Sequence, residues 1–133
     1  MNRIITSGKR KSAVARALIK EGTGKVTLNK KSYEQLQILD RLKIEEPIKI
    51  AEQILGKINF NVSLTARGGG EKSQVEASRL ALARAIVEFT KSKELEKAYL
   101  DYDRNLLVAD VRRKEAYKPG DSKARRKRQK SFR

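Results

Sequence analysis

The chain contains neither cysteine nor histidine among its 133 residues. It therefore cannot form disulfides, a zinc site built from these ligands, or a catalytic triad that uses either side chain. Aromatic residues make up only 5% of the sequence, so a core has to be built mainly from isoleucine, leucine, valine and alanine. No hydrophobic run approaches the roughly 20 residues that cross a bilayer, and the first residues lack the apolar stretch of a signal peptide. We therefore expect a cytoplasmic protein with no membrane contact, no metal and no cofactor.

Positive charge is what the chain has in excess. Its 32 lysines and arginines oppose 16 acidic residues, which gives a net charge of +16. The excess lies at the two ends, because residues 1–31 carry net +8, residues 32–111 net −1 and residues 112–133 net +9. The length suits a single domain. We therefore expect a folded domain over residues 1–116, followed by an extended basic tail over residues 117–133.

Residues 112–133 hold eleven basic residues and very few apolar ones. Such a segment cannot offset its conformational entropy by burial, so we expect it to order on a polyanion, where phosphate neutralisation releases counterions. Tyr117 and Phe132 favour RNA, since exposed aromatic rings stack on unpaired bases. A solubilising tail and a nuclear-import signal are the alternatives.

Two further groups of cations are candidate phosphate contacts. Lys9, Arg10 and Lys11 are adjacent in the chain, and they suit phosphate contact or an ordinary solvated face about equally. Arg67 ends an alternation of apolar and polar residues over residues 57–67. This alternation predicts a strand with one buried and one wet face. The wet face, made of Asn, Ser, Thr and Arg, either touches RNA or is simply solvated.

The remaining pattern alternates short strands with helices. Residues 12–20 and 25–28 predict two strands that pair as a hairpin across a glycine turn. Ser32 is expected to cap a short helix that reaches residue 39. The dipeptide Glu46-Pro47 predicts the start of a second helix, because proline is tolerated in a first turn, and Gly56 is expected to end it.

The strongest helix is predicted over residues 73–91, where Ser73 and Glu76 are spaced as a capping box. Arg79 falls within the apolar arc of this helix, so it is either paired with a buried carboxylate or lies at the edge and reaches a partner. A further helix is predicted over residues 93–102. The apolar residues 105–111 indicate a last buried strand or the approach to one.

Three glycines at positions 68–70 separate the predicted strand from the long helix. Glycine loops before helices can cradle phosphates, but the spacing fits neither GxxxxGK[ST] nor GxGxxG, because Glu71 and Ser73 interrupt the two patterns. Nucleotide binding is therefore not indicated. The run is either a tight turn that lets the backbone approach an RNA phosphate or simply a turn.

Taken together, the segments resemble the family of ribosomal protein nine of the small subunit. The matching pieces are GKRKSAVARAL at 8–18, FNVSLTARGGG at 60–70, QVEASRLALARAI at 74–86, YDRNLLVADVRRKE at 102–115 and QKSFR at 129–133. The resemblance covers nearly the whole chain and favours the archaeal and eukaryotic branch. The chain departs from the family pattern with Val111 in place of proline, a basic run at 123–128 and Phe132 in place of tyrosine.

The resemblance implies an α+β fold: a two-layer sandwich with a left-handed βαβ crossover, like domain two of ribosomal protein five, and an extended basic tail. It implies binding to rRNA in the head of the small subunit, beside neighbouring ribosomal proteins, in the cytoplasm. The tail is expected to reach the anticodon stem-loop of the tRNA in the peptidyl site through Lys130 and Arg133. The expected rRNA contacts are Lys9, Arg10, Lys11, Arg67, Arg112, Arg113, Lys118, Lys123, Arg125, Arg126, Lys127 and Arg128.

Two other classes of protein compete with this interpretation. The charge alone equally allows a free-standing nucleic-acid chaperone or a chromatin-like protein. An enzyme would have to work without histidine, cysteine or a fitting glycine motif, so we expect no catalytic residues.

Overall fold

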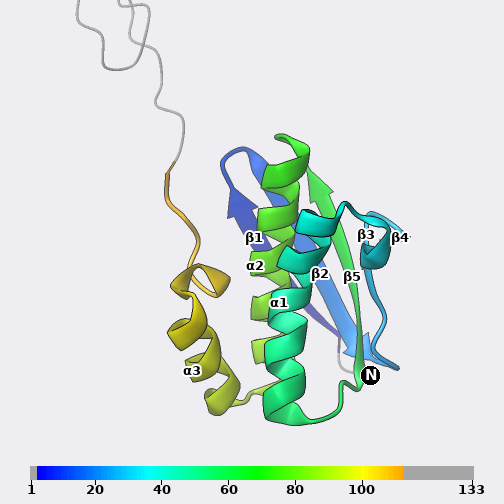
Figure 1. Cartoon of the computed structure of the whole chain (residues 1–133), viewed down its shortest axis with the longest axis vertical. Coiled ribbons are helices and arrows are strands. Elements are labelled where there is room, and N and C mark those ends of the chain that lie inside the picture. The colour runs from blue at the N-terminus through cyan, green and yellow to red at the C-terminus, as the bar shows by residue number, and fades with distance from the viewer. Residues whose placement is uncertain (1–2, 113–133) are drawn as a thin grey trace, which may run out of the picture.

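The computed structural model describes residues 3–112 of the chain. In this part, one mixed sheet lies behind a layer of helices (Figure 1). The strands are β1 (Ile4–Arg10), β2 (Ala13–Glu21), β3 (Val26–Leu28), β4 (Lys31–Ser32) and β5 (Phe60–Arg67). The α-helices are α1 (Ile38–Leu55), α2 (Glu71–Thr90) and α3 (Lys93–Tyr102), and the 3-10 helices are η1 (Tyr33–Gln35) and η2 (Arg104–Leu106). This is the α+β sandwich that the resemblance implies.

The strand order across the sheet is β1-β2-β5-β3-β4. β5 runs antiparallel to β2 and parallel to β3, so α1 is the crossover that joins two parallel neighbours. In Figure 1 the helix layer faces the viewer and β5 points upward. The chain leaves β3, passes through α1 in front of the sheet and enters β5 to the left of β3, which makes the crossover left-handed. This hand is the rare one for a βαβ unit.

The predicted hairpin between residues 12–20 and 25–28 is wrong, because β5 lies between these two strands. The reason is the side chain of Asn61 on β5. Its Oδ1 accepts hydrogen bonds from the amides of Thr23, Gly24 and Lys25, at 3.0, 3.1 and 2.9 Å. The glycine turn is thereby bound to β5 and cannot close a hairpin. β2 instead pairs with β1, a strand that the sequence pattern did not predict.

The core lies between the sheet and the helices. The inward side chains of β2 are small, and Ala13, Ala15 and Ala17 are fully buried. Because these alanines project so little, α2 packs directly on β1 and β2. Gly8 continues this close approach, since a Cβ atom built on it would lie 2.5 Å from the carbonyl oxygen of Ala77 on α2.

The predicted helix start at Glu46-Pro47 is wrong, because α1 already begins at Ile38 and Pro47 lies inside it. Proline lacks the amide that would bond the carbonyl of Lys43, and the burial of the helix face around Pro47 offsets that missing bond. The end at Gly56 is confirmed. Ser32 caps only the 3-10 turn η1, accepting the Glu34 amide at 3.4 Å, so no helix runs from residue 32 to residue 39.

The expected capping box of α2 is also wrong. The helix begins at Glu71 with Gly70 as its N-cap, and Glu76 points to other elements of the fold instead of back to the helix start. Helix 93–102 is confirmed as α3. Residues 105–111 form no strand in the described chain; η2 and an extended segment take their place, with Leu106 buried.

Candidate nucleic-acid interface

The helices cover one face of the sheet, and the other face is open. The strand register lines up cations on it: Lys9 of β1 is opposite Val14 of β2, which is opposite Arg67 of β5. In the next outward row, Arg16 is opposite Thr65. Paired residues project from the same side of a sheet. Lys9, Arg16 and Arg67 therefore lie close together at one end of the open face, and all three are exposed.

We call the outward residues of β1, β2 and β5 the open sheet face. They are Ile5, Ser7, Lys9, Val14, Arg16, Leu18, Lys20, Asn61, Ser63, Thr65 and Arg67. The set contains four cations and no carboxylate. Hydroxyl and amide groups lie between the cations, and Ile5 and Val14 are 69% and 41% exposed. Such a surface can bind phosphates by charge and hydrogen bonds and sugars or bases by apolar contact, without selecting a sequence.

The three glycines after β5 bring a further cation to this end of the sheet. A Cβ atom on Gly68 would lie 2.7 Å from the carbonyl oxygen of Ser12, and Gly68 has φ of +79°. The glycine run thus lets the chain after Arg67 cross the β1–β2 turn at close range. Lys11, exposed in that turn with φ of 54°, is therefore placed at the same end as Arg67. The glycine run is therefore a tight turn packed on the β1–β2 turn, and an approach of its backbone to an RNA phosphate stays a prediction.

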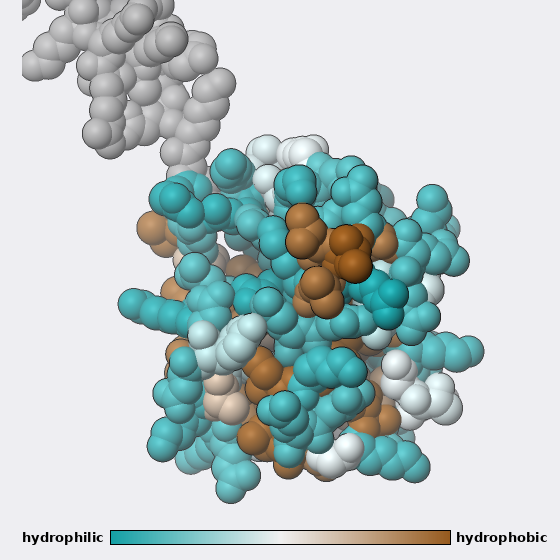
Figure 2. Space-filling model, in the orientation of Figure 1, coloured by the Kyte–Doolittle hydropathy of each residue, from teal (hydrophilic) through white to brown (hydrophobic). Residues whose placement is uncertain are grey.

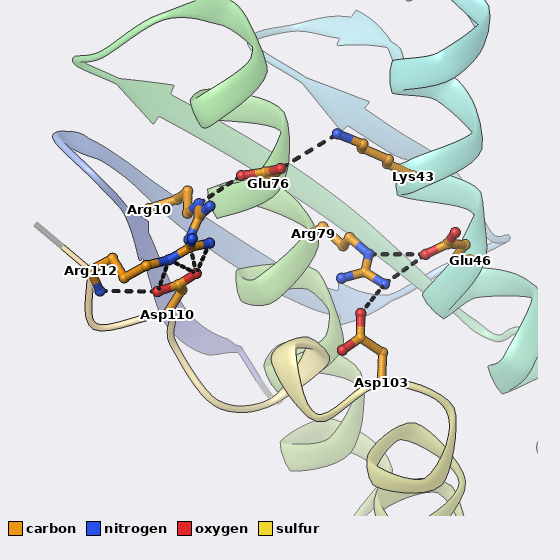
Figure 3. Close-up of polar contacts among 8 residues, drawn as sticks. All are labelled: Arg10, Lys43, Glu46, Glu76, Arg79, Asp103, Asp110 and Arg112. Carbon is orange, nitrogen blue, oxygen red and sulfur yellow. Dashed lines mark hydrogen bonds and ion pairs between the residues drawn. The ribbon is translucent and has the colours of Figure 1, made fainter.

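Arg10 lies on the helix side of the sheet, away from the open sheet face (Figure 3). Its Nε bonds Glu76 of α2 at 2.8 Å, and its Nη1 bonds Asp110. Lys43 of α1 reaches the other oxygen of Glu76 at 3.5 Å. Since the Arg10 side chain is only 17% exposed, its guanidinium is committed to joining β1, α2 and the chain after η2.

Arg112, the last described residue, pairs with the same carboxylate. Its Nη2 lies 2.7 Å from Asp110 Oδ2, while its own side chain is 77% exposed. Hydrogen bonds from Arg112, and after them the interaction with Arg10, hold the pKa of Asp110 well below its ordinary value. The carboxylate therefore stays ionised between two guanidinium groups, and its contact with Arg10 holds the end of the described segment against β1.

A second arginine of α2 anchors the same segment through backbone groups. Arg84 Nε donates to the carbonyl of Leu107 at 2.9 Å, and its Nη1 donates to the carbonyl of Ser7 at 3.0 Å. The segment from Asp103 to Arg112 is thus held near its middle by Arg84 and near its end by Asp110.

The sequence left open whether Arg79 pairs with a carboxylate of the fold or reaches a partner. In the structure it bridges three elements of the fold (Figure 3). Its guanidinium bonds Glu46 of α1 at 2.6 Å and Asp103, just after α3, at 3.2 Å. Arg79 is therefore paired within the fold. The groove around it, about 390 Å³ in volume, is lined by four basic and four acidic side chains and also by Lys9, whose side chain the strand alternation directs to the open sheet face. Because these charges nearly cancel, the groove is a poor site for a polyanion.

The structure therefore divides the predicted RNA contacts into three groups. Lys9, Lys11 and Arg67 gather at one end of the open sheet face. Arg10 and Arg112 lie instead at the root of the tail, engaged by Asp110. The contacts outside the described residues are Arg113, Lys118, Lys123, Arg125, Arg126, Lys127, Arg128, Lys130 and Arg133.

The sequence interpretation did not include Arg16 among the contacts. The signal was present, since Arg16 alternates with the buried alanines of β2, and residues that alternate with buried ones on an outer face are exposed. Residues 3–112 contain no cluster of acidic side chains that could hold a metal ion. None of the helices in this part of the chain is long and apolar enough to span a membrane.

A small α+β body with a cationic open sheet face, together with a strongly basic C-terminal sequence, is typical of nucleic-acid-binding proteins. The family model described as ribosomal protein S9/S16 matches residues 8–133. The chain is 46% identical to the small ribosomal subunit protein uS9 of Methanococcus vannielii and 47% identical to that of Thermoplasma volcanium, covering the whole of both chains in each case. The chain belongs to the ribosomal protein S9/S16 family.

This membership confirms the resemblance drawn from the sequence, and the two relatives named above are archaeal. It makes the chain a structural, non-enzymatic component of the small ribosomal subunit, with rRNA and ribosomal proteins as its partners.

Proposed function

We propose that the protein binds rRNA in the head of the small subunit through its open sheet face and extends its tail to the tRNA in the peptidyl site. The observation that carries the first half is the alignment of Lys9, Arg16 and Arg67 on a face without carboxylates. Close cations of one sign focus the field and attract a polyanion. Lys11 adds a fourth charge at the same end.

The second half concerns the tail. We assign residues 1–116 to anchoring and residues 117–133 to reaching the tRNA. Seventeen extended residues span roughly 55 Å at about 3.3 Å each, so a thin segment passes between RNA helices where a folded domain does not fit. The contacts of Asp110 with Arg10 and Arg112 support the assignment of this part of the chain to the anchoring body, because they hold it against β1.

The proposed contacts follow this division. Lys130 and Arg133 contact tRNA phosphates, and the basic residues of the tail before them contact the rRNA backbone. Phosphate contacts position a partner without reading its sequence, which suits a site that accepts every tRNA. Arg10 and Arg112 take part by holding Asp110 at the root of the tail.

Co-sedimentation with small subunits in high salt tests the division. We compare the full chain with a chain ending at Lys118. Both are expected to remain bound, and subunits with the shorter chain are expected to hold peptidyl-site tRNA less well. If the wash removes both chains from the subunits, the proposed anchoring of the body is wrong. If subunits with the shorter chain bind tRNA as well as those with the full chain, the proposed role of the tail is wrong.

A salt titration with defined rRNA tests the open sheet face. The triple variant Lys9→Gln, Arg16→Gln, Arg67→Gln is compared with Lys49→Gln, Lys93→Gln, Lys97→Gln, which removes three exposed lysines of the helix layer. The slope of log K against log salt should fall by about 0.7–0.9 for each phosphate that the first variant no longer neutralises, and it should stay unchanged in the second. Equal slopes for the two triple variants would contradict the proposal. Equal affinity of the natural chain for random duplex DNA would favour a nonspecific chaperone.

A further inference from the structure

We propose that the RNA backbone bound to the open sheet face passes across the end of the sheet, where Lys30 in the β3–β4 turn is a further phosphate contact. The path is marked by Lys11, Arg67 and Lys30, which we call the sheet-end row. Lys30 is not part of the open sheet face, and the strand register alone places it on this path. The inference rests on the proposed function, because it extends the route of the same RNA.

The β3–β4 turn is bound to the end of β5. The amide of Asn29 donates to the carbonyl of Leu64 at 2.8 Å, and Oδ1 of Asn29 accepts the amide of Ala66 at 2.9 Å. Lys30 is the next residue in the chain, so these two bonds place it beside the last residues of β5. Arg67, the residue that ends β5, is therefore its neighbour across one strand spacing.

The β1–β2 turn lies on the other side of β5, because the strand order is β1-β2-β5-β3-β4. Figure 1 shows β1 and β5 pointing to the same end of the sheet, where α2 begins. Gly68 packs on the carbonyl of Ser12, which brings Lys11 to this end. The two turns are about three strand spacings apart, so the sheet-end row is on the order of 14 Å long and crosses the strands. Arg67 lies near its middle.

The charge at this end of the sheet suits a polyanion. Residues 11–12, 29–32 and 67–72 meet here, and their exposed charged side chains are Lys11, Lys30, Lys31, Arg67 and Lys72 against Glu71 alone. None of these five cations has an ion-pair partner within residues 3–112. The next acidic residue, Glu34, lies towards α1, since burial and then the charges of Glu45 and Glu34 raise the pKa of Tyr33. Unpaired cations of one sign attract a phosphate backbone.

The backbone of the two turns is a second, independent observation. Lys11 and Lys30 have φ of 54° and 69°, in the left-handed region that favours glycine. Two-residue hairpin turns with positive φ at both positions usually have glycine second, and Lys30 takes that position after Asn29. A lysine in this conformation is less favourable for folding than glycine, which points to a use for its side chain.

The helix layer does not continue the sheet-end row. Figure 2 shows apolar side chains, in brown, over the start of α1, where Ile38, Leu39 and Leu42 are exposed. Apolar side chains neutralise no phosphate and release no counterions. The RNA backbone is therefore expected to stay on the side of the open sheet face.

A salt titration with defined rRNA compares Lys30 with a matched lysine. Lys91 is exposed, has φ of 53° and follows the 20-residue helix α2, which puts it about 30 Å from the sheet-end row. Lys30→Gly and Lys91→Gly therefore remove the same charge from the same backbone conformation. The slope of log K against log salt should fall by about 0.7–0.9 in Lys30→Gly and stay unchanged in Lys91→Gly. Lys30→Gln, which keeps a side chain in the turn, should give the same lower slope as Lys30→Gly.

The outcomes separate this inference from the proposed function. An unchanged slope in Lys30→Gly and Lys30→Gln, with a lower slope in Arg16→Gln, would overturn the inference and leave the open sheet face standing. Unchanged slopes in all three variants would overturn both. Equal losses in Lys30→Gly and Lys91→Gly would mean that only the total charge matters, which would also overturn the inference.

Crosslinking in assembled small subunits tests the path of the RNA. The chain has no cysteine, so Ser12→Cys and Lys31→Cys each carry one photo-crosslinker beside an end of the sheet-end row and leave its three cations in place. We expect both to attach to one rRNA strand, a few nucleotides apart, and Lys91→Cys to attach to neither stretch. Attachment of Lys31→Cys to a protein, to nothing or to a different rRNA strand from Ser12→Cys would overturn the inference.

Discussion

The guanidinium of Arg79 on α2 lies 2.6 Å from Glu46 on α1 and 3.2 Å from Asp103 after α3, so one side chain ties all three helices together. The Arg79 side chain is 13% exposed, whereas the two carboxylates are 36% and 39% exposed. Solvent therefore screens the two ion pairs and limits how much they stabilise the fold, although the nitrogen–oxygen distances are short.

Replacing Arg79 with methionine removes the bridge and keeps the apolar stem. We expect the free energy of unfolding to fall by about 1–2 kcal/mol, since two partly exposed carboxylates then lack their shared partner. Urea denaturation measures the change. The control Arg41→Met removes a pair within one helix, whose arginine is 46% exposed against 13% for Arg79, and should cause a smaller change. Equal destabilisation in the two variants would show that the bridge does not join the helices energetically.

Gly8 is expected to tolerate no side chain. A Cβ atom there would lie 2.5 Å from the Ala77 carbonyl oxygen and 2.8 Å from the Ala81 amide nitrogen, both backbone atoms of α2. Gly8→Ala should destabilise the fold by about 1–3 kcal/mol by forcing β1 away from α2. Gly70→Ser is the matched control, because nothing lies within 4 Å of its Cβ position and serine suits an N-cap. A neutral Gly8→Ala would contradict the close packing.

Asp110 is expected to hold the root of the tail in a pH-dependent way. Its pKa is lowered in the fold by Arg112 and Arg10, so its contribution is present above the ordinary aspartate pKa and is lost as the pH falls below it. Asp110→Asn should reduce the hydrogen-exchange protection of the Val108 amide, which bonds the Arg104 carbonyl at 3.0 Å.

The difference in protection between the natural chain and Asp110→Asn should be full at pH 7 and shrink in strong acid. Glu88→Gln, an exposed carboxylate on α2, serves as the control and should leave Val108 unchanged. A difference that persists at the lowest pH would mean that ionisation of Asp110 is not what anchors this segment.

Tyr99 joins α3 to α1 from within the core. It is fully buried, its hydroxyl donates to the Pro47 carbonyl at 2.7 Å, and burial raises the pKa of that hydroxyl. Tyr99→Phe should lower the free energy of unfolding by about 1 kcal/mol at neutral pH. Because the folded pKa is raised, the natural chain should also lose stability as the pH rises above about 10, the ordinary tyrosine pKa.

The Tyr99→Phe variant should show a smaller alkaline destabilisation, with the part due to Tyr33, whose pKa burial also raises, remaining. Denaturant titrations at pH 8 and pH 11 measure the comparison. Tyr102→Phe is the control, since Tyr102 is 57% exposed and should behave like the natural chain. If the natural chain and Tyr99→Phe lose the same free energy of unfolding between pH 8 and pH 11, groups other than Tyr99 cause the loss.

The elements that the sequence predicted correctly are those with a strong local pattern. The strand predicted over residues 57–67 is present as β5 from Phe60 to Arg67, where buried and exposed residues alternate, and α3 has a serine cap and a helical apolar spacing. The errors occurred where a distant residue decides the local structure. Asn61 binds the glycine turn of residues 23–25 from another strand, and burial against the core keeps Pro47 inside a helix.

The same distinction applies to the candidate interface. Sequence indicated cations near residues 9–11 and at Arg67, but neighbours in the chain alternate sides of a strand. Arg10 therefore points to Glu76 and Asp110 while Lys9 faces outward. Arg16 joined the interface only because the register of β2 places it beside them.

The sequence by itself determined the basic character, the exclusion of histidine and cysteine chemistry, and the ribosomal family, because composition and motif order need no coordinates. Only the tertiary structure decided which cations share a face and which are neutralised by carboxylates far away in the chain. These are properties of pairs of residues brought together by strand register and helix packing, and no local pattern contains them.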